Sequence, residues 1–390
     1  MVGVLLVVLL GAAATLRGSG PPPSLGGHLR SGASIAASPP PAPQPTPGER
    51  APRSLTVIGA GDVLLHSPVW RQAAADAAAA GRAGYDFGPI FAGVAPAITA
   101  SDLAICHMET PLGPPGGPFM GYPLFSVPPQ VATALRQAGY DTCSTASNHT
   151  LDGGEQGVYR TLDTLEAAGL RHAGSYRSAA AQRIPTILDV RGVRVAHLSY
   201  TSGFNGLSRP AGKAWLANLL DPAAVLDEAR RARSAGADIV VASLHWGIEY
   251  DHRASPDQVA LARRLLGPAG VDLILGSHAH VVQPLEEVNG AWVAYGMGNH
   301  IARQSAAYPD RREGVMPRFT FTEQAPGRWA VTKVEAVATW IDLAPQIRIV
   351  DLAAALADPA TPPASREPYR SAQRRITGYL QARGVRLDGS

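Results

Sequence analysis

Apolar runs of strand length alternate with helical patterns from Leu55 onward. Val271, Leu273, Ile274 and Leu275, for example, make a nearly continuous apolar run, which is typical of a strand buried on both faces of a sheet. The segments between such runs repeat apolar residues every three to four positions, which predicts helices. This alternation, with hairpins inserted, indicates a layered α/β domain in which helices flank central sheets.

The expected elements follow one another closely along the chain. Strands are expected at 55–65, 101–110, 140–150, 237–247 and 271–280, and hairpins at 186–200 and 285–300. Helices are expected at 69–81, 128–139, 154–169, 221–236 and 255–267. Asn289-Gly290 is a strong signal for the turn of the second hairpin. The pattern is weaker after about residue 318, where strands at 318–323, 329–341 and 347–352 and a helix at 366–384 are expected.

The first 53 residues have a different composition. The opening stretch "MVGVLLVVLLGAAATLRG" has the length of a signal-peptide core and is short for a membrane span, although no positive charge precedes it. Residues 19–53 hold ten prolines, which predicts a stiff, disordered linker. We therefore expect a signal peptide or membrane anchor at 1–18 and an extracytoplasmic protein, either membrane-anchored or secreted.

Composition narrows the class of protein. Hydrophobic residues make up 46% of the 390 residues and charged residues 17%, which supports a sizeable buried core. The net charge of +3 is too small to indicate nucleic-acid binding, and no cluster of basic and aromatic residues supports it. The chain has two cysteines, Cys106 and Cys143, which could form one disulfide. We expect them instead to be two separate, buried thiols that pack as small apolar side chains.

Polar residues that can bind metals or transfer protons gather where the predicted strands end. These residues are Asp62, His66, His107, Glu109, Asn148, His149, Asp152, His245, Glu249, His278, His280 and Asn299. Because the carboxyl ends of strands in an α/β sheet share one edge, residues far apart in sequence can converge there. Carboxylate, amide and imidazole groups together suit zinc, manganese or iron(II). The sequence therefore predicts a site for one or two divalent ions.

Several of these stretches resemble one known family in sequence and order. "VIGAGDVLLH", "ICHMETPLG", "TASNHTLDGGEQG", "SLHWGIEY", "GSHAHVVQPLE" and "YGMGNH" are similar to motifs of the CapA family, capsule or poly-γ-glutamate synthesis proteins. The resemblance implies a calcineurin-like metallophosphatase fold, with central mixed sheets flanked by helices. We expect this domain to cover residues 54–345, followed by a C-terminal extension with a helix at 346–390.

The resemblance also implies roles for individual residues. It places Asp62, Glu109, Asn148, His245, His278 and His280 as metal ligands. It makes His149 the acid or transition-state stabiliser, and Glu109 the likelier carboxylate to bridge two metals. From the residues themselves, we expect Asp152 to order the loop of His149 and His66 to be a further catalytic candidate. His107, Glu249 and Asn299 are expected to face the substrate, although Glu249 could instead position His252 or face water.

The chain also departs from the family pattern. Metallophosphatases generally open with Asp-x-His, but here Val63 and Leu64 follow Asp62, and the nearest histidine is His66. His107 stands where asparagine is common, and Ala279 where proline is common. These differences affect the number of metals and the substrate contacts more than the fold.

Two functions follow as hypotheses. The first is a cell-surface metal-dependent hydrolase-type protein, directed at phosphoesters or γ-glutamyl bonds, that helps to make or anchor an anionic surface polymer. The second is a non-catalytic, metal-containing accessory subunit that binds the polymer or its synthase during export. A nucleotide-binding protein is disfavoured, because "GAGDVLLH" lacks the G-x-G-x-x-G spacing.

Overall fold

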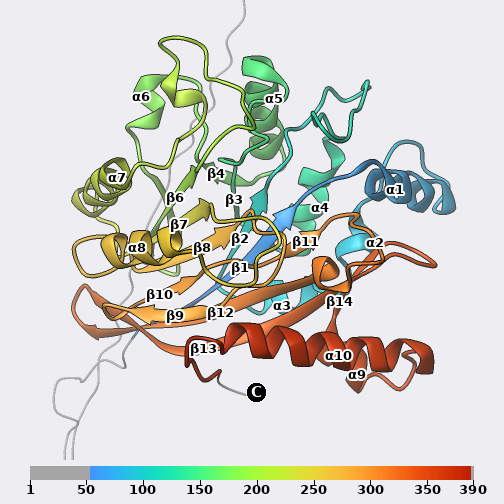
Figure 1. Cartoon of the computed structure of the whole chain (residues 1–390). Coiled ribbons are helices and arrows are strands. Elements are labelled where there is room, and N and C mark those ends of the chain that lie inside the picture. Colours follow the sequence, from blue (N-terminus) through green and yellow to red (C-terminus); the bar gives the residue numbers. More distant parts are fainter. Residues whose placement is uncertain (1–52, 388–390) are drawn as a thin grey trace, which may run out of the picture. The chain divides into compact units, whose positions relative to one another are not determined.

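Two mixed β-sheets lie against each other, with helices on their outer faces (Figure 1). The computed structural model describes residues 53–387; the predicted signal or anchor segment and all of the predicted linker except Arg53 lie outside them. The first sheet has the order β14-β13-β12-β1-β2-β3-β4, with β11 paired to β1, and the second has the order β5-β6-β7-β8-β10-β9. The predicted layered α/β class is confirmed.

The strands and helices have the following bounds. The first sheet contains β1 (Ser54–Val63), β2 (Leu103–Met108), β3 (Thr142–Ser144), β4 (Arg171–Ala173), β11 (Asn299–Ile301), β12 (Glu313–Ala325), β13 (Arg328–Asp342) and β14 (Arg348–Asp351). The second contains β5 (Thr186–Val190), β6 (Val193–Thr201), β7 (Ile239–His245), β8 (Leu273–Ser277), β9 (Leu285–Val288) and β10 (Ala291–Ala294). The α-helices are α1 (Ser67–Ala79), α2 (Gly88–Phe91), α3 (Ala95–Thr99), α4 (Gln130–Ala138), α5 (Gly154–Ala167), α6 (Ala179–Gln182), α7 (Pro222–Ser234), α8 (Pro256–Leu265), α9 (Leu352–Ala357) and α10 (Pro363–Leu380). Two short 3-10 helices are η1 (Ala214–Leu216) and η2 (Pro309–Arg312).

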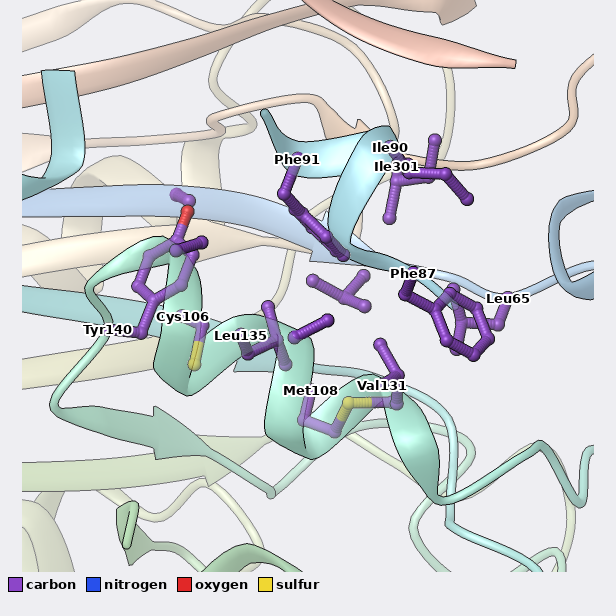
Figure 2. Close-up of a cluster of buried hydrophobic side chains, with 14 of the residues drawn as sticks. Leu65, Phe87, Ile90, Phe91, Cys106, Met108, Val131, Leu135, Tyr140 and Ile301 are labelled. Atoms are coloured by element: carbon purple, nitrogen blue, oxygen red, sulfur yellow. The ribbon is translucent and has the colours of Figure 1, made fainter. Parts of the chain in front are cut away.

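Strand β2 shows why the central strands read as continuous apolar runs. Leu103 and Ile105 point into the core between the two sheets, whereas Ala104, Cys106 and Met108 point into the core on the other side. Figure 2 shows this second cluster, where side chains of β2 meet those of α2 and α4. Both faces of the strand are buried, so polar alternation is absent.

The second sheet is covered in the same way. In β7, Ile239 and Val241 face the core between the sheets, and Val240, Ala242 and Leu244 face α7 and α8. Burial on both faces holds the strands rigidly from end to end. Side chains at the strand ends are therefore placed by the packing of the whole strand.

The predicted hairpin at 285–300 is only partly correct. Strands β9 and β10 pair through a turn at Asn289-Gly290, both with positive φ (56° and 76°), as the turn signal predicted. The chain then leaves the second sheet after Ala294, and residues 299–301 form β11, which pairs in parallel with β1 in the first sheet. Residues 285–300 thus join the two sheets.

Two glycines allow this crossing next to Asp62. The amide of Asp62 donates to the carbonyl of Gly298 at 3.0 Å. A Cβ atom on Gly61 would lie 1.9 Å from that carbonyl oxygen, so any side chain at Gly61 would separate the two segments. Gly298 itself has a φ of 69°, which disfavours other residues.

The two cysteines form a disulfide, so the prediction of two separate thiols is wrong. Cys106 on β2 and Cys143 on β3 are direct partners in the parallel register, with Cα atoms 4.4 Å apart. Both are fully buried. Sequence spacing could not show this, because the register of β2 and β3 decides it.

The C-terminal residues pack onto the first sheet. Strand β14 pairs with β13, and α9 and α10 lie along the same part of the sheet (Figure 1). Tyr369, Ala372 and Ile376 of α10 join the core that also contains Phe319 of β12. Within residues 53–387, no helix has both the length and the apolar character needed to cross a membrane.

The disulfide is expected to stabilise the fold. A Cys106→Ala/Cys143→Ala variant should lose about 2–4 kcal/mol of unfolding free energy, measured by urea denaturation. Alkylation of the wild type in denaturant without reductant should label neither cysteine. Labelling of both would show that the disulfide is absent.

Glu228 on α7 is a buried carboxylate that opposes folding when ionised. It accepts hydrogen bonds from the hydroxyls of Tyr200 and Tyr176, and burial raises its pKa to about 7. The folded protein therefore holds this proton more tightly than the unfolded chain. Its contribution to stability falls as pH rises from about 4.3, the unfolded value, through about 7.

A Glu228→Gln variant should therefore gain stability relative to the wild type as pH rises from 5 to 8. The expected gain is on the order of 2–3 kcal/mol, measured by urea denaturation at both pH values. The exposed Glu287→Gln change on β9 is the control and should show no such trend. Parallel pH profiles for Glu228→Gln and wild type would contradict the expected role.

Candidate metal centre

The ends of strands from both sheets bring polar side chains together. The contributors are Asp62 from β1, His107 from β2 with Glu109 just after it, Asn148 and His149 after β3, His245 from β7, His278 and His280 after β8, and Asn299 from β11. All of them are buried except His278, which is partly buried. The structure therefore brings these predicted residues together.

The first cluster consists of Asp62, Glu109 and His280, whose ligand atoms all lie within 4.8 Å of one another. Nδ1 of His280 is 3.2 Å from Oδ2 of Asp62, and its Nε2 is 3.7 Å from Oε1 of Glu109. Within residues 53–387, neither oxygen of Glu109 has a hydrogen-bond donor. Buried carboxylate oxygens without donors are costly, so this cluster is incomplete without a cation.

The second cluster consists of Asp62, His107 and His245. Nε2 of His107 lies 3.7 Å from Oδ1 of Asp62 and shares a hydrogen bond of 2.9 Å with Nδ1 of His245. Nε2 of His245 is in turn 3.0 Å from Oδ1 of Asn148. Asp62, and not Glu109 as expected, therefore belongs to both clusters. Asn148 joins the second cluster through its amide.

His107 has a different setting from the one that we expected. It was predicted to face the substrate, but it is buried and belongs to the second cluster. Its Nδ1 is held by Ser144 at 2.7 Å. Ser144, on β3 beside β2, was not among the predicted site residues, and nothing in the sequence around it signals this contact.

The turn after β8 places its two histidines differently. The amide of His278 donates to Oδ1 of Asp62 at 3.1 Å, and its ring lies 4.6 Å from that of His245 between centroids. Its buried Nδ1 has no hydrogen-bond partner among the described residues. Both His278 and His280 have positive φ (92° and 56°), a strained conformation for residues other than glycine.

The protonation states favour metal binding. Burial lowers the pKa of His245 and His278, and that of His107 to about 4, so these rings are neutral at pH 7, as metal ligands must be. Burial also opposes protonation of His280, but Glu109 and Asp62 raise its pKa to about 10. A bound cation would take the place of that proton.

The two carboxylates respond to burial in opposite ways. Burial raises the pKa of Glu109 well above its usual value. Burial acts in the same direction on Asp62, but contact with His280 and the amide of His278 bring its pKa below the usual value. Asp62 is therefore the carboxylate that stays charged in the absence of metal.

His149 and Asp152 form a pair beside these clusters. Nδ1 of His149 lies 2.7 Å from Oδ2 of Asp152, which also accepts the amide of Phe125 at 2.8 Å. The ring of Phe125 stands edge-on to His149 and to His66, with centroids 4.7 and 5.6 Å away. Burial lowers the pKa of His66 to about 4, and its Nδ1 accepts the amide of Arg303.

Asn299 and Glu249 were both expected to face the substrate, but Asn299 is buried against His280 and Glu249 is exposed. Oδ1 of Asn299 is 3.1 Å from Nδ1 of His280, and its amide donates to the carbonyl of His280. Asn299 therefore orients a predicted ligand. Glu249 is exposed on the loop after β7. Asn205, which was not predicted, accepts from the amide of Asn148 at 3.2 Å, although it is exposed on a loop without a sequence signal.

The residues present fit one or two divalent ions. One ion would be held by two carboxylates and an imidazole, those of Asp62, Glu109 and His280. A second ion would be held by Asp62, by the amide oxygen of Asn148, and by the imidazole of either His107 or His245. The donors are oxygen and nitrogen without thiolate, since both cysteines are in the disulfide. The buried, donor-free oxygens of Glu109 are the strongest structural sign of a missing cation.

Comparison with protein families matches this part of the chain. The family described as "Bacterial capsule synthesis protein PGA_cap" matches residues 56–304, which include every strand end described above. This chain belongs to the PGA_cap family. The resemblance to CapA proteins seen in the sequence motifs is confirmed.

Named relatives support the same family. The chain is 31% identical over 203 residues to the PGA biosynthesis protein CapA of Bacillus subtilis, covering 52% of each protein. It is 30% identical over 178 residues to the capsule biosynthesis protein CapA of Bacillus anthracis, covering 45% of this chain and 43% of the relative. A probable polyglutamine synthesis accessory protein of Mycobacterium tuberculosis is 30% identical over 214 residues, with 52% and 56% covered. The PGA_cap chain thus spans about half the length of these relatives.

Solved structures share a similar arrangement to a limited degree. A calcineurin-like phosphoesterase from Bacillus subtilis, YfkN, superposes with a TM-score of 0.44 at 11% identity, covering 85% of this chain and 99% of that one. A putative 5'-nucleotidase from Staphylococcus aureus gives a TM-score of 0.45 at 12% identity, covering 83% and 58%. Similarity of this extent does not by itself assign chemistry to this PGA_cap protein.

Metal should stabilise the wild type through Glu109. Mn²⁺ or Zn²⁺ at about 100 times its Kd is expected to add about 2.7 kcal/mol, seen as a rise in Tm. Glu109→Gln should lose most of this rise, because it removes an anionic ligand. Glu249→Gln, an exposed carboxylate nearby, should keep it. An equal rise in Tm for Glu109→Gln would exclude Glu109 as a ligand.

Proposed function

We propose that this protein is a metal-dependent hydrolase-type member of the PGA_cap family that acts on an anionic polymer, or on a linkage that anchors it. The observation that carries the proposal is the pair of clusters that share the buried carboxylate of Asp62. A carboxylate between two ligand sets can bridge two cations, an arrangement common in enzymes that hydrolyse phosphate and amide bonds. Divalent ions bound there would polarise a phosphoryl, ester or amide oxygen and lower the pKa of a water molecule.

The protein's own residues would supply proton transfer. With Nδ1 of His149 directed at Asp152, its Nε2 is the atom available to donate to a leaving group. The edge of Phe125 limits rotation of the ring. Asp152 thus positions His149.

The names of the relatives support a role in polymer synthesis, and the disulfide supports a location outside the cytoplasm. Relatives are described as PGA or capsule biosynthesis proteins and as a probable polyglutamine synthesis accessory protein. We propose that this chain acts in the same kind of process, with a surface polymer or its synthase and export complex as partner. The disulfide between Cys106 and Cys143 supports a place outside the cytoplasm, since oxidising compartments favour such bonds. A signal or anchor at 1–18 would provide the route.

A non-catalytic accessory role is the second candidate. It is favoured by the second cluster, where the imidazoles of His107 and His245 bond to each other and His245 also bonds to Asn148. These hydrogen bonds satisfy the ring nitrogens and the amide oxygen of the cluster in the absence of a cation. A single bound metal with no hydrolysis would fit this role, whereas two metals would fit catalysis.

Hydrolysis should depend on metal and on His149. The purified protein should cleave bis-p-nitrophenyl phosphate or γ-linked glutamate oligomers, lose this activity in chelator, and regain it with Mn²⁺ or Zn²⁺. His149→Asn should lower kcat about 10²- to 10⁴-fold without loss of metal. His278→Ala/His280→Ala should lose both metal and activity, measured by elemental analysis alongside the assay.

His172→Asn is the matched control, because His172 lies on β4 and pairs with Glu166 away from the clusters. It should keep full activity. Full activity of the His278→Ala/His280→Ala variant would overturn the hydrolase proposal. One bound metal with no cleavage of either substrate would favour the accessory role.

A further inference from the structure

Arg311 lies between two tyrosine rings beside the metal centre. Its guanidinium carbon is 3.7 Å from the ring centroid of Tyr250 and 4.1 Å from that of Tyr308. Tyr250 follows β7, and Arg311 belongs to η2, so two distant segments form this stack. Stacking fixes the plane of a guanidinium while leaving its edge free to donate hydrogen bonds.

This stack is attached to the H-x-H turn at both ends. The amide of Tyr250 donates to the carbonyl of Ala279 at 2.7 Å, and its ring lies 6.0 Å from that of His280 between centroids. The carbonyl of Arg311 accepts from the side-chain amide of Asn299 at 2.9 Å. Asn299 also contacts His280, so any shift of the arginine is coupled to a predicted metal ligand.

Arg311 has no anionic partner in the described part of the chain. Its neighbour Arg312 faces Asp342 and donates to the carbonyl of Ile341, and Asp310 faces His252. No carboxylate between residues 53 and 387 lies within ion-pair distance of Arg311, and its buried Nε has no hydrogen-bond acceptor there. A partly buried guanidinium with unused donors is suited to an external anion.

The stack is also open to solvent. The tyrosines retain 37% (Tyr250) and 49% (Tyr308) of their accessible surface. Other exposed large side chains on loops that follow the strands of the site include Ile248 and Tyr122. A ligand in solution can therefore reach the stack.

We propose that Arg311, held between Tyr250 and Tyr308, binds an oxyanion group of the substrate, a carboxylate or a phosphate, next to the bond to be cleaved. This inference rests on the proposed function, because it names the group that the same site would recognise. The planar fork of arginine matches both anions with two parallel hydrogen bonds, which lysine cannot make. Arg311 would thus select anionic substrates without holding the metal.

Binding measurements on the Mn²⁺-loaded protein test this role. The probes are a γ-linked glutamate pentamer, the same pentamer with its side-chain carboxylates amidated, and inorganic phosphate. By calorimetry, Arg311→Gln should bind the anionic pentamer at least about tenfold more weakly, the loss expected for a charge-assisted pair. Arg311→Lys should recover only part of the affinity. The amidated pentamer should bind wild type and Arg311→Gln equally.

Two controls separate this role from loss of charge or fold. Arg253→Gln removes an exposed positive charge on the loop after β7 and should bind like the wild type. Elemental analysis should show equal Mn²⁺ content in every variant. Because Arg311→Lys keeps the charge and the length, it also reports on anion binding if Arg311→Gln folds poorly.

Each outcome decides the inference. A loss of phosphate binding alone in Arg311→Gln would identify the anion as phosphate, and a loss of pentamer binding alone would identify it as carboxylate. The assignment would be overturned if Arg311→Gln bound both the anionic pentamer and phosphate with wild-type affinity. It would also be overturned if the wild type bound neither of these two anions. Hydrolysis of bis-p-nitrophenyl phosphate by the same samples reports separately on the proposed function. Arg311-dependent binding without hydrolysis would retain the anion site and refute the enzyme.

Discussion

The buried carboxylate of Asp62 is the constraint around which the rest of the site is arranged. It belongs to both clusters of possible ligands and accepts the amide of His278, and its own amide donates to the carbonyl of Gly298, where the crossing segment meets β1. A charged group with no exposure to water must be compensated by its neighbours. His280 and the amide of His278 supply that compensation from the turn after β8, which ties the second sheet to β1 of the first.

This arrangement makes stability and cation binding two aspects of the same electrostatic balance. In the absence of metal, His280 carries a proton between Asp62 and Glu109, and Glu109 itself is driven toward its neutral form by burial. The oxygens of Glu109 have no donors in the described part of the chain. A buried carboxylate without donors lowers the stability of the metal-free protein but raises the affinity of the site for a cation, as is common where a fold is built around a ligand.

The disulfide and the Arg311 stack hold different parts of the site. Cys106 and Cys143 join the two strands that lead to Glu109 and Asn148, so the positions of these residues are covalently restrained. At the rim, Arg311 is held by rings and not by an ion pair, which keeps its donors available. A rigid base and an accessible charged rim suit a site that receives one part of a long chain molecule.

The amino-acid sequence alone determined the layered α/β class, most elements, the family, and which residue types gather at strand ends. These features are local: apolar periodicity, turn residues and short motifs are properties of neighbouring residues. Only the tertiary structure decided that His107 joins a ligand cluster, that residues 299–301 leave one sheet for the other, that the cysteines are bonded, and that Arg311 meets Tyr250. Each of these depends on strand register and on contacts between segments distant in sequence, which no local pattern encodes.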